Sequence, residues 1–133
     1  LGDVYKRQID TSTSYMNSDM LKEMSNNGMS IENHTHHHFD LPTGSIENQK
    51  ATIKKGQEIL KEKVGVESKF LCYPTGKYTK DTISVLDNLG VKAAVTTKGG
   101  IAHIGNGLYE LRRVRMSPMN IEAFSSIFTS YMN

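Results

Sequence analysis

The chain of 133 residues is long enough for one domain with a hydrophobic core, and its formal net charge of +2 comes from interspersed basic and acidic residues. This charge pattern argues against a nucleic-acid surface, which needs a basic stripe, and no apolar run approaches the length of a membrane span. The single cysteine, Cys72, excludes an intrachain disulfide and a cysteine-based zinc site.

The first eight residues show neither a helix cap nor a hydrophobic period, and no signal peptide is visible at the start. They resemble a translated junction more than the beginning of a domain. We therefore expect residues 1–8 to be non-native and residues 9–133 to form the domain. If residues 1–8 are foreign, the chain is a piece of a longer protein whose own N-terminal part is missing.

Hydrophobic spacing and turn residues predict helices that alternate with short strands. In chain order these are helix 18–27, strand 29–33, helix 46–64, strand 70–73, helix 80–89, strand 91–97, strand 111–116 and a helix from 121. Residues that favour helix N-caps mark the helix starts: Ser18, Ser45, Thr79 and Asn120. The last helix is expected to bury Ile121, Phe124 and Ile127. The alternation favours parallel strands joined by crossovers.

Three loops follow predicted strands and carry polar or glycine residues. They are the histidine run 34–38, the turn 73–76 and the Gly-rich segment 96–100. In folds with parallel strands, functional sites gather at the C-terminal ends of the strands. The sequence therefore predicts that these three loops share one rim of the sheet.

The histidine run is the strongest functional signal, because four of the five histidines fall within residues 34–38. Imidazole is the commonest metal ligand among side chains. His34 and His38 are four residues apart, so they can turn toward one ion if the backbone coils once between them. The alternative is a solvated or tag-like loop, but a tag lies at a terminus and lacks a preceding strand.

Neighbouring residues are assigned more ordinary roles. His36 and His37 are expected to be exposed, because one loop cannot turn four successive imidazoles onto one ion. Asp40 is an alternative carboxylate ligand, although acidic residues near such loops are usually solvated. Cys72, between Leu71 and Tyr73 in a predicted strand, is expected to be a buried and inert thiol.

These residues carry a resemblance to the polysaccharide deacetylases of the NodB-homology class, the carbohydrate esterases of family four. The family's second motif, H-[S/T]-x-x-H, matches residues 34–38, and its third motif, R-x-P-Y-G, falls on Cys72–Gly76. Residues 91–97 and 108–114 also resemble a bacterial, mostly Gram-positive branch of the family, and Arg113 aligns with a recurrent arginine of that branch. The resemblance covers residues 9 to about 128.

The resemblance implies a distorted (β/α) barrel, incomplete here because its first strand or strands are missing. It implies hydrolysis of N-acetyl groups on a polysaccharide such as peptidoglycan or poly-N-acetylglucosamine, outside or on the surface of a bacterial cell. It also implies a divalent metal, usually zinc, held by His34, His38 and an aspartate, with Thr35 fixing the loop or an imidazole through its hydroxyl. The backbone N–H of Thr75 corresponds to a donor for the oxyanion.

Contacts with the substrate are expected from the third motif and from the strand that follows the Gly-rich loop. The residues concerned are Tyr73, Pro74, Gly76 and Arg113. The aromatic and basic residues of this region also have ordinary alternatives. Tyr73 and Tyr78 either stack on sugars or pack in the core. Arg112, Arg113 and Arg115 either line a groove or form a solvated face.

The departures from the family pattern bear on activity. The first motif, T-F-D-D, supplies the general base and the third metal ligand, and the chain has no Asp-Asp pair. The motif-three arginine is replaced by Cys72 and its tyrosine by Thr75, and His103 does not match the histidine that serves as general acid in many members. The intact parent is therefore expected to be a deacetylase and this chain alone to be inactive.

Two further hypotheses remain open at this point. The first hypothesis is that the chain is a non-catalytic member of the same fold that binds glycan or metal. The replacement of arginine by Cys72 favours this hypothesis. A weaker alternative is an unrelated metal hydrolase that uses H-x-x-x-H, which needs a further carboxylate or histidine cluster downstream. A Thr-Phe-Asp-Asp segment in the natural sequence before Ile9 would favour the enzyme.

Overall fold

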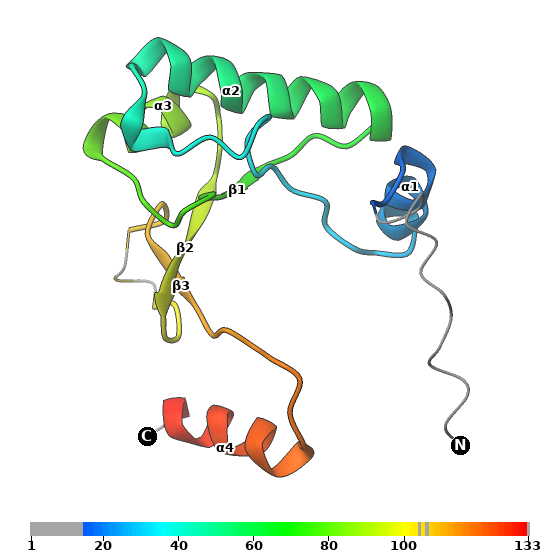
Figure 1. Ribbon diagram of the computed structural model, residues 1–133, viewed down its shortest axis with the longest axis vertical. Helices are drawn as coiled ribbons and strands as arrows, with labels where there is room; N and C mark the ends of the chain where they lie inside the picture. Colours follow the sequence, from blue (N-terminus) through cyan, green and yellow to red (C-terminus); the bar gives the residue numbers. More distant parts are fainter. Residues whose placement is uncertain (1–14, 104, 106, 133) are drawn as a thin grey trace.

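The structure is a computed structural model that describes residues 15–103, 105 and 107–132. Its centre is a three-stranded parallel sheet in the order β1 (Phe70–Cys72), β2 (Ala93–Gly99), β3 (Leu111–Arg113) (Figure 1). The predicted α/β class with parallel strands is therefore confirmed. The expected junction at residues 1–8 lies outside the described residues, so that expectation stays a prediction.

In the described residues, four α-helices accompany the sheet: α1 (Ser18–Asn26), α2 (Ile46–Ile59), α3 (Lys80–Asn88) and α4 (Ile121–Met132). A short 3-10 helix, η2 (Leu41–Thr43), precedes α2, and a π-helical turn, η3 (Leu60–Val64), extends it. As predicted, Ser45 and Thr79 cap α2 and α3. The cap of α1 is Asn17 rather than Ser18, because the extended backbone of Asn17 lets its side chain accept from the N–H of Met20.

Strand boundaries differ more from the prediction than helix boundaries do. Residues 29–33 do not form a strand within the described part of the chain; Asn33 alone makes a parallel bridge, to Leu71. Strand 91–97 is displaced to Ala93–Gly99, and strand 111–116 ends at Arg113. A strand is defined by its hydrogen-bonded partner, which a local pattern of apolar residues does not contain.

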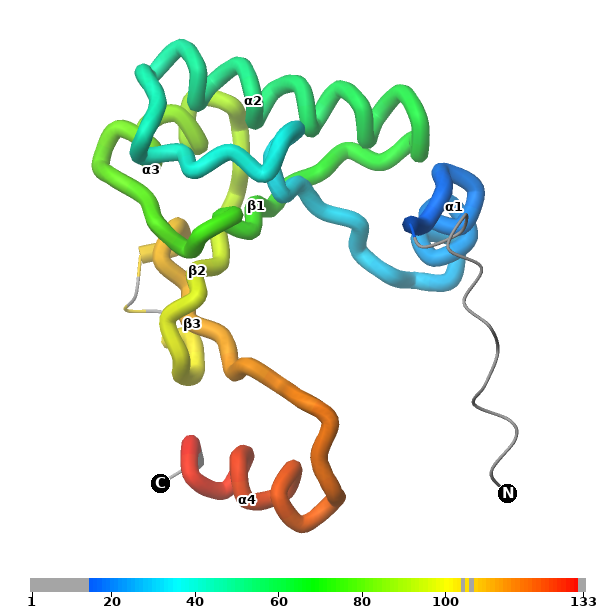
Figure 2. The backbone as a smooth tube through the Cα atoms, viewed as in Figure 1, coloured from blue at the N-terminus to red at the C-terminus, as the bar shows by residue number. Residues whose placement is uncertain are grey.

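The core lies between α2, α3 and the first two strands, and Figures 1 and 2 show α2 and α3 close together above the sheet. Its side chains come from segments far apart in the sequence: Leu41, Ile53, Leu71, Tyr73, Val85, Leu86, Val91 and Ala94. Burial of this apolar surface is the main driving force that holds the helices on the sheet. The His loop between Asn33 and Leu41 is attached to this core at both ends.

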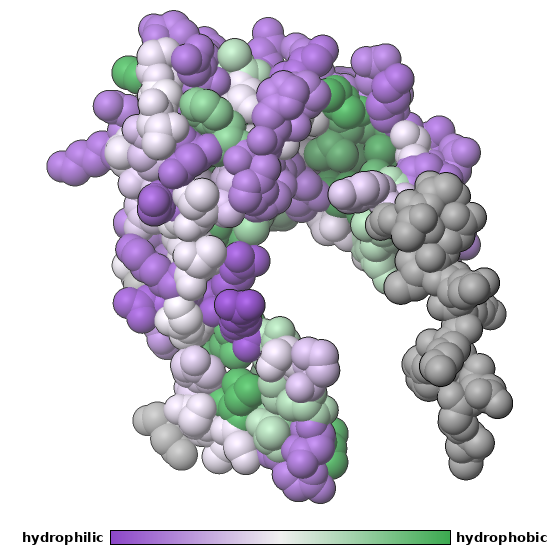
Figure 3. Space-filling model, in the orientation of Figure 1, coloured by the Kyte–Doolittle hydropathy of each residue, from purple (hydrophilic) through white to green (hydrophobic). Residues whose placement is uncertain are grey.

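The last helix lies apart from this core, beyond the ends of β2 and β3 (Figures 1 and 2). Asn120 caps it by accepting from the N–H of Ala123, as predicted. The predicted burial of its apolar side chains is wrong, because Ile121 is 71% exposed and Phe124 is 42% exposed. Green apolar surface is visible on this part of the molecule in Figure 3. The helical spacing of apolar residues predicts an apolar face but does not say what covers it.

Within the part of the chain that the structure describes, each helix is too short or too polar to cross a membrane.

The carboxylate of Glu32 fixes the start of β1. It accepts hydrogen bonds from the backbone N–H groups of Lys69 (2.8 Å) and Phe70 (2.9 Å) and from the hydroxyls of Ser30 and Ser68. Partial burial raises the pKa of Glu32, but the hydrogen bonds from Ser30, Phe70, Ser68 and Lys69 outweigh it, so the pKa lies below its usual value.

Glu32→Gln is expected to lower the free energy of unfolding by about 1 kcal/mol at pH 7, because the uncharged amide replaces a charged acceptor that is partly exposed to solvent. Since folding lowers the pKa of Glu32, its stabilisation is complete above the ordinary value of 4.5 and is lost as the pH falls through the folded value. The difference between wild type and variant should therefore shrink below pH 4.5 in denaturant titrations. Glu23→Gln, at an exposed position of α1, is the matched control; an equal effect there would contradict the assignment.

Candidate metal site

The first predicted ligand, His34, is anchored to β1. The bridge between Asn33 and Leu71 places His34 beside the C-terminal end of β1, where its Nδ1 lies 2.7 Å from the carbonyl oxygen of Cys72. A carbonyl oxygen only accepts hydrogen bonds, so Nδ1 carries the proton and donates. In the neutral ring this leaves the lone pair of Nε2 available to a metal ion.

The second predicted ligand, His38, lies next to the first. The ring centroids of His34 and His38 are 4.9 Å apart, with an angle of 76° between the ring planes, and both side chains are exposed. Two imidazoles bound to one zinc ion through nitrogens at ~2.0–2.1 Å have centroids roughly 5 Å apart. The separation of the rings is therefore that expected of two ligands of one metal ion, and the role of His34 and His38 as ligands stays a prediction.

Thr35 shapes the loop between the two histidines. Its Oγ1 accepts a hydrogen bond from the backbone N–H of Phe39 at 3.1 Å, which closes the coil around His38. Both Thr35 (φ 66°) and His38 (φ 53°) adopt left-handed backbone conformations, which are rare for residues other than glycine. The hydroxyl thus fixes the loop backbone, one of the two indirect roles expected of Thr35.

A third ligand is not grouped with the two histidines in the described residues, which contain no cluster of three or more His, Cys, Asp or Glu side chains suited to a metal ion. Asp40, the alternative ligand, is engaged elsewhere. Its Oδ1 accepts a hydrogen bond from Oγ1 of Thr75 at 2.8 Å, and its Oδ2 lies 3.7 Å from Nζ of Lys77. The described residues therefore offer two nitrogen ligands.

The three predicted site loops do meet at one rim. Thr75, the expected oxyanion donor, connects to the His loop through Asp40, and the adjacent Gly76 lies against the side chain of Thr97 at the end of β2. Gly76 has φ +73°, and a Cβ atom there would collide with Thr97. Glycine is thus required at position 76 both for backbone conformation and for the approach of the two loops. Pro74 is partly buried in the same turn.

Tyr73 lies in the core and not on the exposed rim, where the expected contact with a sugar would place it. Its side chain is fully buried, its hydroxyl donates to the carbonyl oxygen of Tyr109 at 3.0 Å, and its ring stacks on Tyr78 at 5.0 Å between centroids. Burial raises the pKa of Tyr73, with smaller contributions from Tyr78, Glu110 and Tyr109. The core-packing alternative therefore describes this residue, which belongs to the core cluster and contacts Tyr78 and Tyr109.

Arg113 is exposed at the C-terminal end of β3, on the same edge of the parallel sheet as the His loop. It lines a cavity of about 530 Å³ together with Thr97, Gly99, Val114, Arg115 and Met116. This position agrees with either expected role, a groove contact or a solvated face.

His36 and His37 are exposed, as predicted, and their rings contact each other at 3.8 Å between centroids. They line a cavity against α2 together with Phe39 and Thr52, and His36 also lines the cavity next to His34. Sequence reasoning missed Asn33, which is buried directly before the first ligand. Two features of the sequence could have indicated its role: the asparagine stands next to a predicted ligand, and a glycine, Gly56, lies in the interior of a predicted helix.

Comparisons with known proteins show the family of this chain. The model of the family described as polysaccharide deacetylase matches residues 5–94. The Bacillus subtilis (strain 168) protein YxkH, which is assigned to the polysaccharide deacetylases, is 30% identical over 117 residues, covering 87% of this chain and 42% of YxkH.

Two solved structures are similar in sequence and fold. The Streptococcus pyogenes deacetylase PplD, solved in complex with acetate, is 32% identical with a TM-score of 0.80, covering 87% of this chain and 52% of PplD. A polysaccharide deacetylase from Bacillus cereus is 27% identical with a TM-score of 0.72, covering 82% of this chain and 35% of that one. This chain spans about half the length of these relatives or less, in keeping with part of their fold. It belongs to the polysaccharide deacetylase family.

Proposed function

We propose that this chain is part of a metal-dependent hydrolase that removes N-acetyl groups from a glycan. The observation that carries the proposal is the pair His34–His38, whose rings are 4.9 Å apart and exposed on the rim where the strands end. Deacetylation breaks the amide C–N bond of an acetamido group, consumes one water molecule and yields acetate and a free amine. The acetate in the structure of PplD supports this assignment, because acetate is the product of such a reaction.

The residues of this chain have separable tasks in the proposed reaction. His34 and His38 hold a divalent metal, most simply zinc, and the hydrogen bond from Nδ1 of His34 to Cys72 leaves the lone pair of Nε2 available to that ion. When bound, such an ion polarises the acetyl carbonyl and lowers the pKa of a water molecule. The backbone N–H of Thr75, on the adjacent loop, is the candidate donor to the oxyanion. Asp40 holds the Thr75 loop against the His loop.

The substrate that we propose is an N-acetylated polysaccharide, either peptidoglycan or poly-N-acetylglucosamine, and the proposed location is the surface or exterior of a bacterial cell. Support for a polysaccharide substrate comes from the family and from the relatives that it contains, and the proposed location follows only from that substrate. Pro74, Gly76 and Arg113 remain the proposed substrate contacts, because the third-motif turn and the end of β3 lie on the same rim as His34. The exposed cavity at Arg113 is large enough to admit part of a glycan.

A second candidate function is that of a non-catalytic relative that binds glycan or metal. It is favoured by Cys72, which stands at the arginine position of the third motif, and by the presence of only two grouped ligands among the described residues. The two functions differ in one measurable property, the release of acetate from a chain that also carries the family's Asp-Asp motif.

Zinc binding tests the metal site directly. Calorimetry on the 133-residue chain is expected to show zinc binding weaker than that of a complete three-ligand site, and His34→Ala/His38→Ala should weaken it at least tenfold. His36→Ala/His37→Ala is the matched control, because it removes two imidazoles from the same loop, and it should change the affinity by less than about threefold. Equal zinc affinity in the wild type and in His34→Ala/His38→Ala would refute the assignment.

A further inference from the structure

We infer that Asn33 and Gly56 form a positioning pair that holds the backbone between His34 and His38 in its coiled form. The inference rests on the proposed metal role of these two histidines. It concerns neither a ligand nor a substrate contact, but the way in which helix α2 sets the distance between the two imidazoles.

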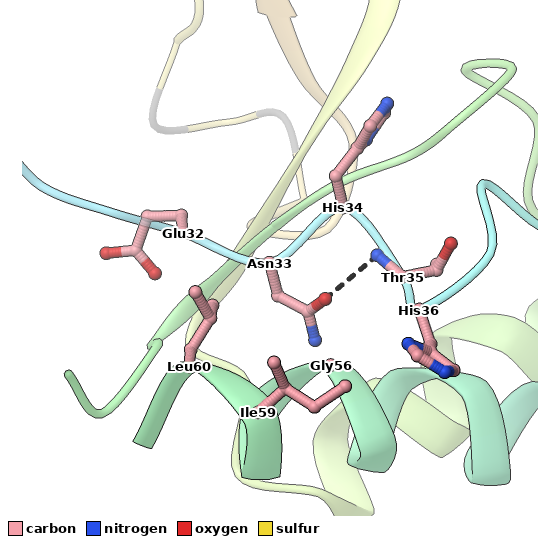
Figure 4. A pocket seen from close by; sticks show the side chains of 8 residues that line it. All are labelled: Glu32, Asn33, His34, Thr35, His36, Gly56, Ile59 and Leu60. Carbon is pink, nitrogen blue, oxygen red and sulfur yellow. Dashed lines mark hydrogen bonds between the residues drawn. The ribbon is translucent and has the colours of Figure 1, made fainter. Parts of the chain in front are cut away.

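Asn33 connects three parts of the structure through one buried side chain, which is 3% exposed. Its Nδ2 donates to the carbonyl oxygen of Ile53 in α2 at 2.9 Å, and its Oδ1 accepts from the N–H of Thr35 at 2.8 Å. Its backbone carbonyl accepts from the N–H of Cys72 at the end of β1 at 3.0 Å. Figure 4 shows the carboxamide between the loop and the helix, with the hydrogen bond to Thr35 drawn as a dashed line.

Gly56 makes room for this carboxamide. It is buried in the interior of α2, and a Cβ atom at this position would collide with Oδ1 of Asn33 and lie 3.0 Å from its Cγ and Nδ2. Glycine within a helix is less favourable than alanine, so a close approach by another group explains its presence. In Figure 4, Gly56 lies on the helix directly beneath Asn33. The pair is therefore matched in shape.

The segment that the pair holds is strained. Thr35 is β-branched and has φ 66°, a conformation that such residues rarely adopt. A side-chain oxygen that accepts from the N–H two residues later forms an Asx-type turn, and here it holds Thr35 from the N-terminal side. The hydrogen bond from the N–H of Phe39 to Oγ1 of Thr35 holds it from the other side.

Without the carboxamide, we expect Thr35 to relax toward an ordinary backbone conformation. The coil would then open, and His34 and His38 would no longer be held 4.9 Å apart. Asn33→Ala should therefore weaken zinc binding at least tenfold, the range seen when residues behind metal ligands are removed. It should also speed hydrogen exchange at the N–H groups of Thr35 and Phe39 at least tenfold, a readout that needs no metal.

Asn33→Ala/Gly56→Ala separates positioning from general stability. The methyl group introduced at position 56 occupies space that the carboxamide has left, and alanine favours the helix, so the thermal midpoint should return toward that of the wild type. If Asn33 positions the loop, exchange at Thr35 and Phe39 stays fast and zinc affinity stays low in this double variant. If the double variant regains wild-type exchange at Phe39 and wild-type zinc affinity, Asn33 is merely structural and the inference fails.

Asn33→Asp supplies a second test if Asn33→Ala does not fold. The carboxylate keeps an acceptor for the N–H of Thr35 but loses the donor to Ile53. Zinc affinity and exchange at Thr35 should therefore stay within about threefold of the wild type even though the thermal midpoint falls. A loss as large as that of Asn33→Ala would overturn the inference. If the wild type and His34→Ala/His38→Ala bind zinc equally, the proposed metal role fails, and exchange at Thr35 and Phe39 still decides whether Asn33 positions the loop.

Discussion

Acetate release from N-acetylglucosamine oligomers is expected to be undetectable with the 133-residue chain. The described residues bring together only two candidate metal ligands, His34 and His38, and the sequence has no Asp-Asp pair to supply a base and a third ligand. Loss of a general base alone costs about two to four orders of magnitude in rate, and weak metal retention adds to this. A chain extended at its N-terminus by a segment with the Asp-Asp motif should release acetate in the presence of zinc, measured by a coupled acetate assay.

The extended chain also tests each ligand separately. His34→Ala and His38→Ala should each abolish acetate release at the zinc concentration that saturates the unsubstituted chain, because each removes one of the ligands. His36→Ala and His37→Ala serve as controls and should retain most of the activity. If the extended chain is active and either His34→Ala or His38→Ala keeps full activity, the metal site is assigned wrongly. If it is folded, binds zinc and releases no acetate, the non-catalytic function is favoured.

The isolated chain is expected to associate in solution through α4. Ile121, Phe124, Phe128 and Tyr131 are all exposed, by 71%, 42%, 49% and 42%. Exposed apolar patches of this kind promote association, since contact removes them from water. Light scattering should therefore report a mass well above that of a 14.9 kDa monomer, and Phe124→Lys/Phe128→Lys should lower it toward the monomer value.

Two lysines on the polar face of the same helix provide the matched control. Ser125→Lys/Thr129→Lys adds the same charge to α4 and leaves the exposed phenylalanines in place. It should therefore remain associated, whereas a charge effect alone would dissociate both variants equally. A monodisperse monomer of the unsubstituted chain with a cooperative thermal transition would contradict the prediction. It would show that the exposed apolar face of α4 does not cause association.

Several local features could be predicted from the sequence because their causes are local. The caps of α2 and α3 depend on a hydroxyl three residues before a free backbone N–H, and both Ser45 and Thr79 meet that condition. The parallel sheet follows from the alternation of helices and strands, because crossovers of that length join parallel strands. The approach of His34 and His38 follows from their spacing once the loop between them coils.

Other features could not be predicted, because their causes lie in parts of the chain that are distant in sequence. The apolar pattern around residue 73 is the same for a core tyrosine and for one that faces a sugar, and only the packing with Tyr78 and Tyr109 shows that Tyr73 is buried. The apolar spacing of α4 predicts a face that packs in the core. Only the position of the helix in space shows that this face is exposed. Whether a side chain is buried depends on the neighbours that it contacts in the folded structure.

The sequence by itself determined the spacing of His34 and His38, the α/β class and the family, because each depends on residue types at fixed spacings or on their order along the chain. The tertiary structure decided how the pair is held. The side chain of Asn33 donates to Ile53, 20 residues away, and accepts from Thr35, 2 residues away. The fit of its carboxamide over Gly56 exists only when α2 packs beneath the His loop. Such a contact depends on the relative position of two elements, and that position is set by the burial of the whole core.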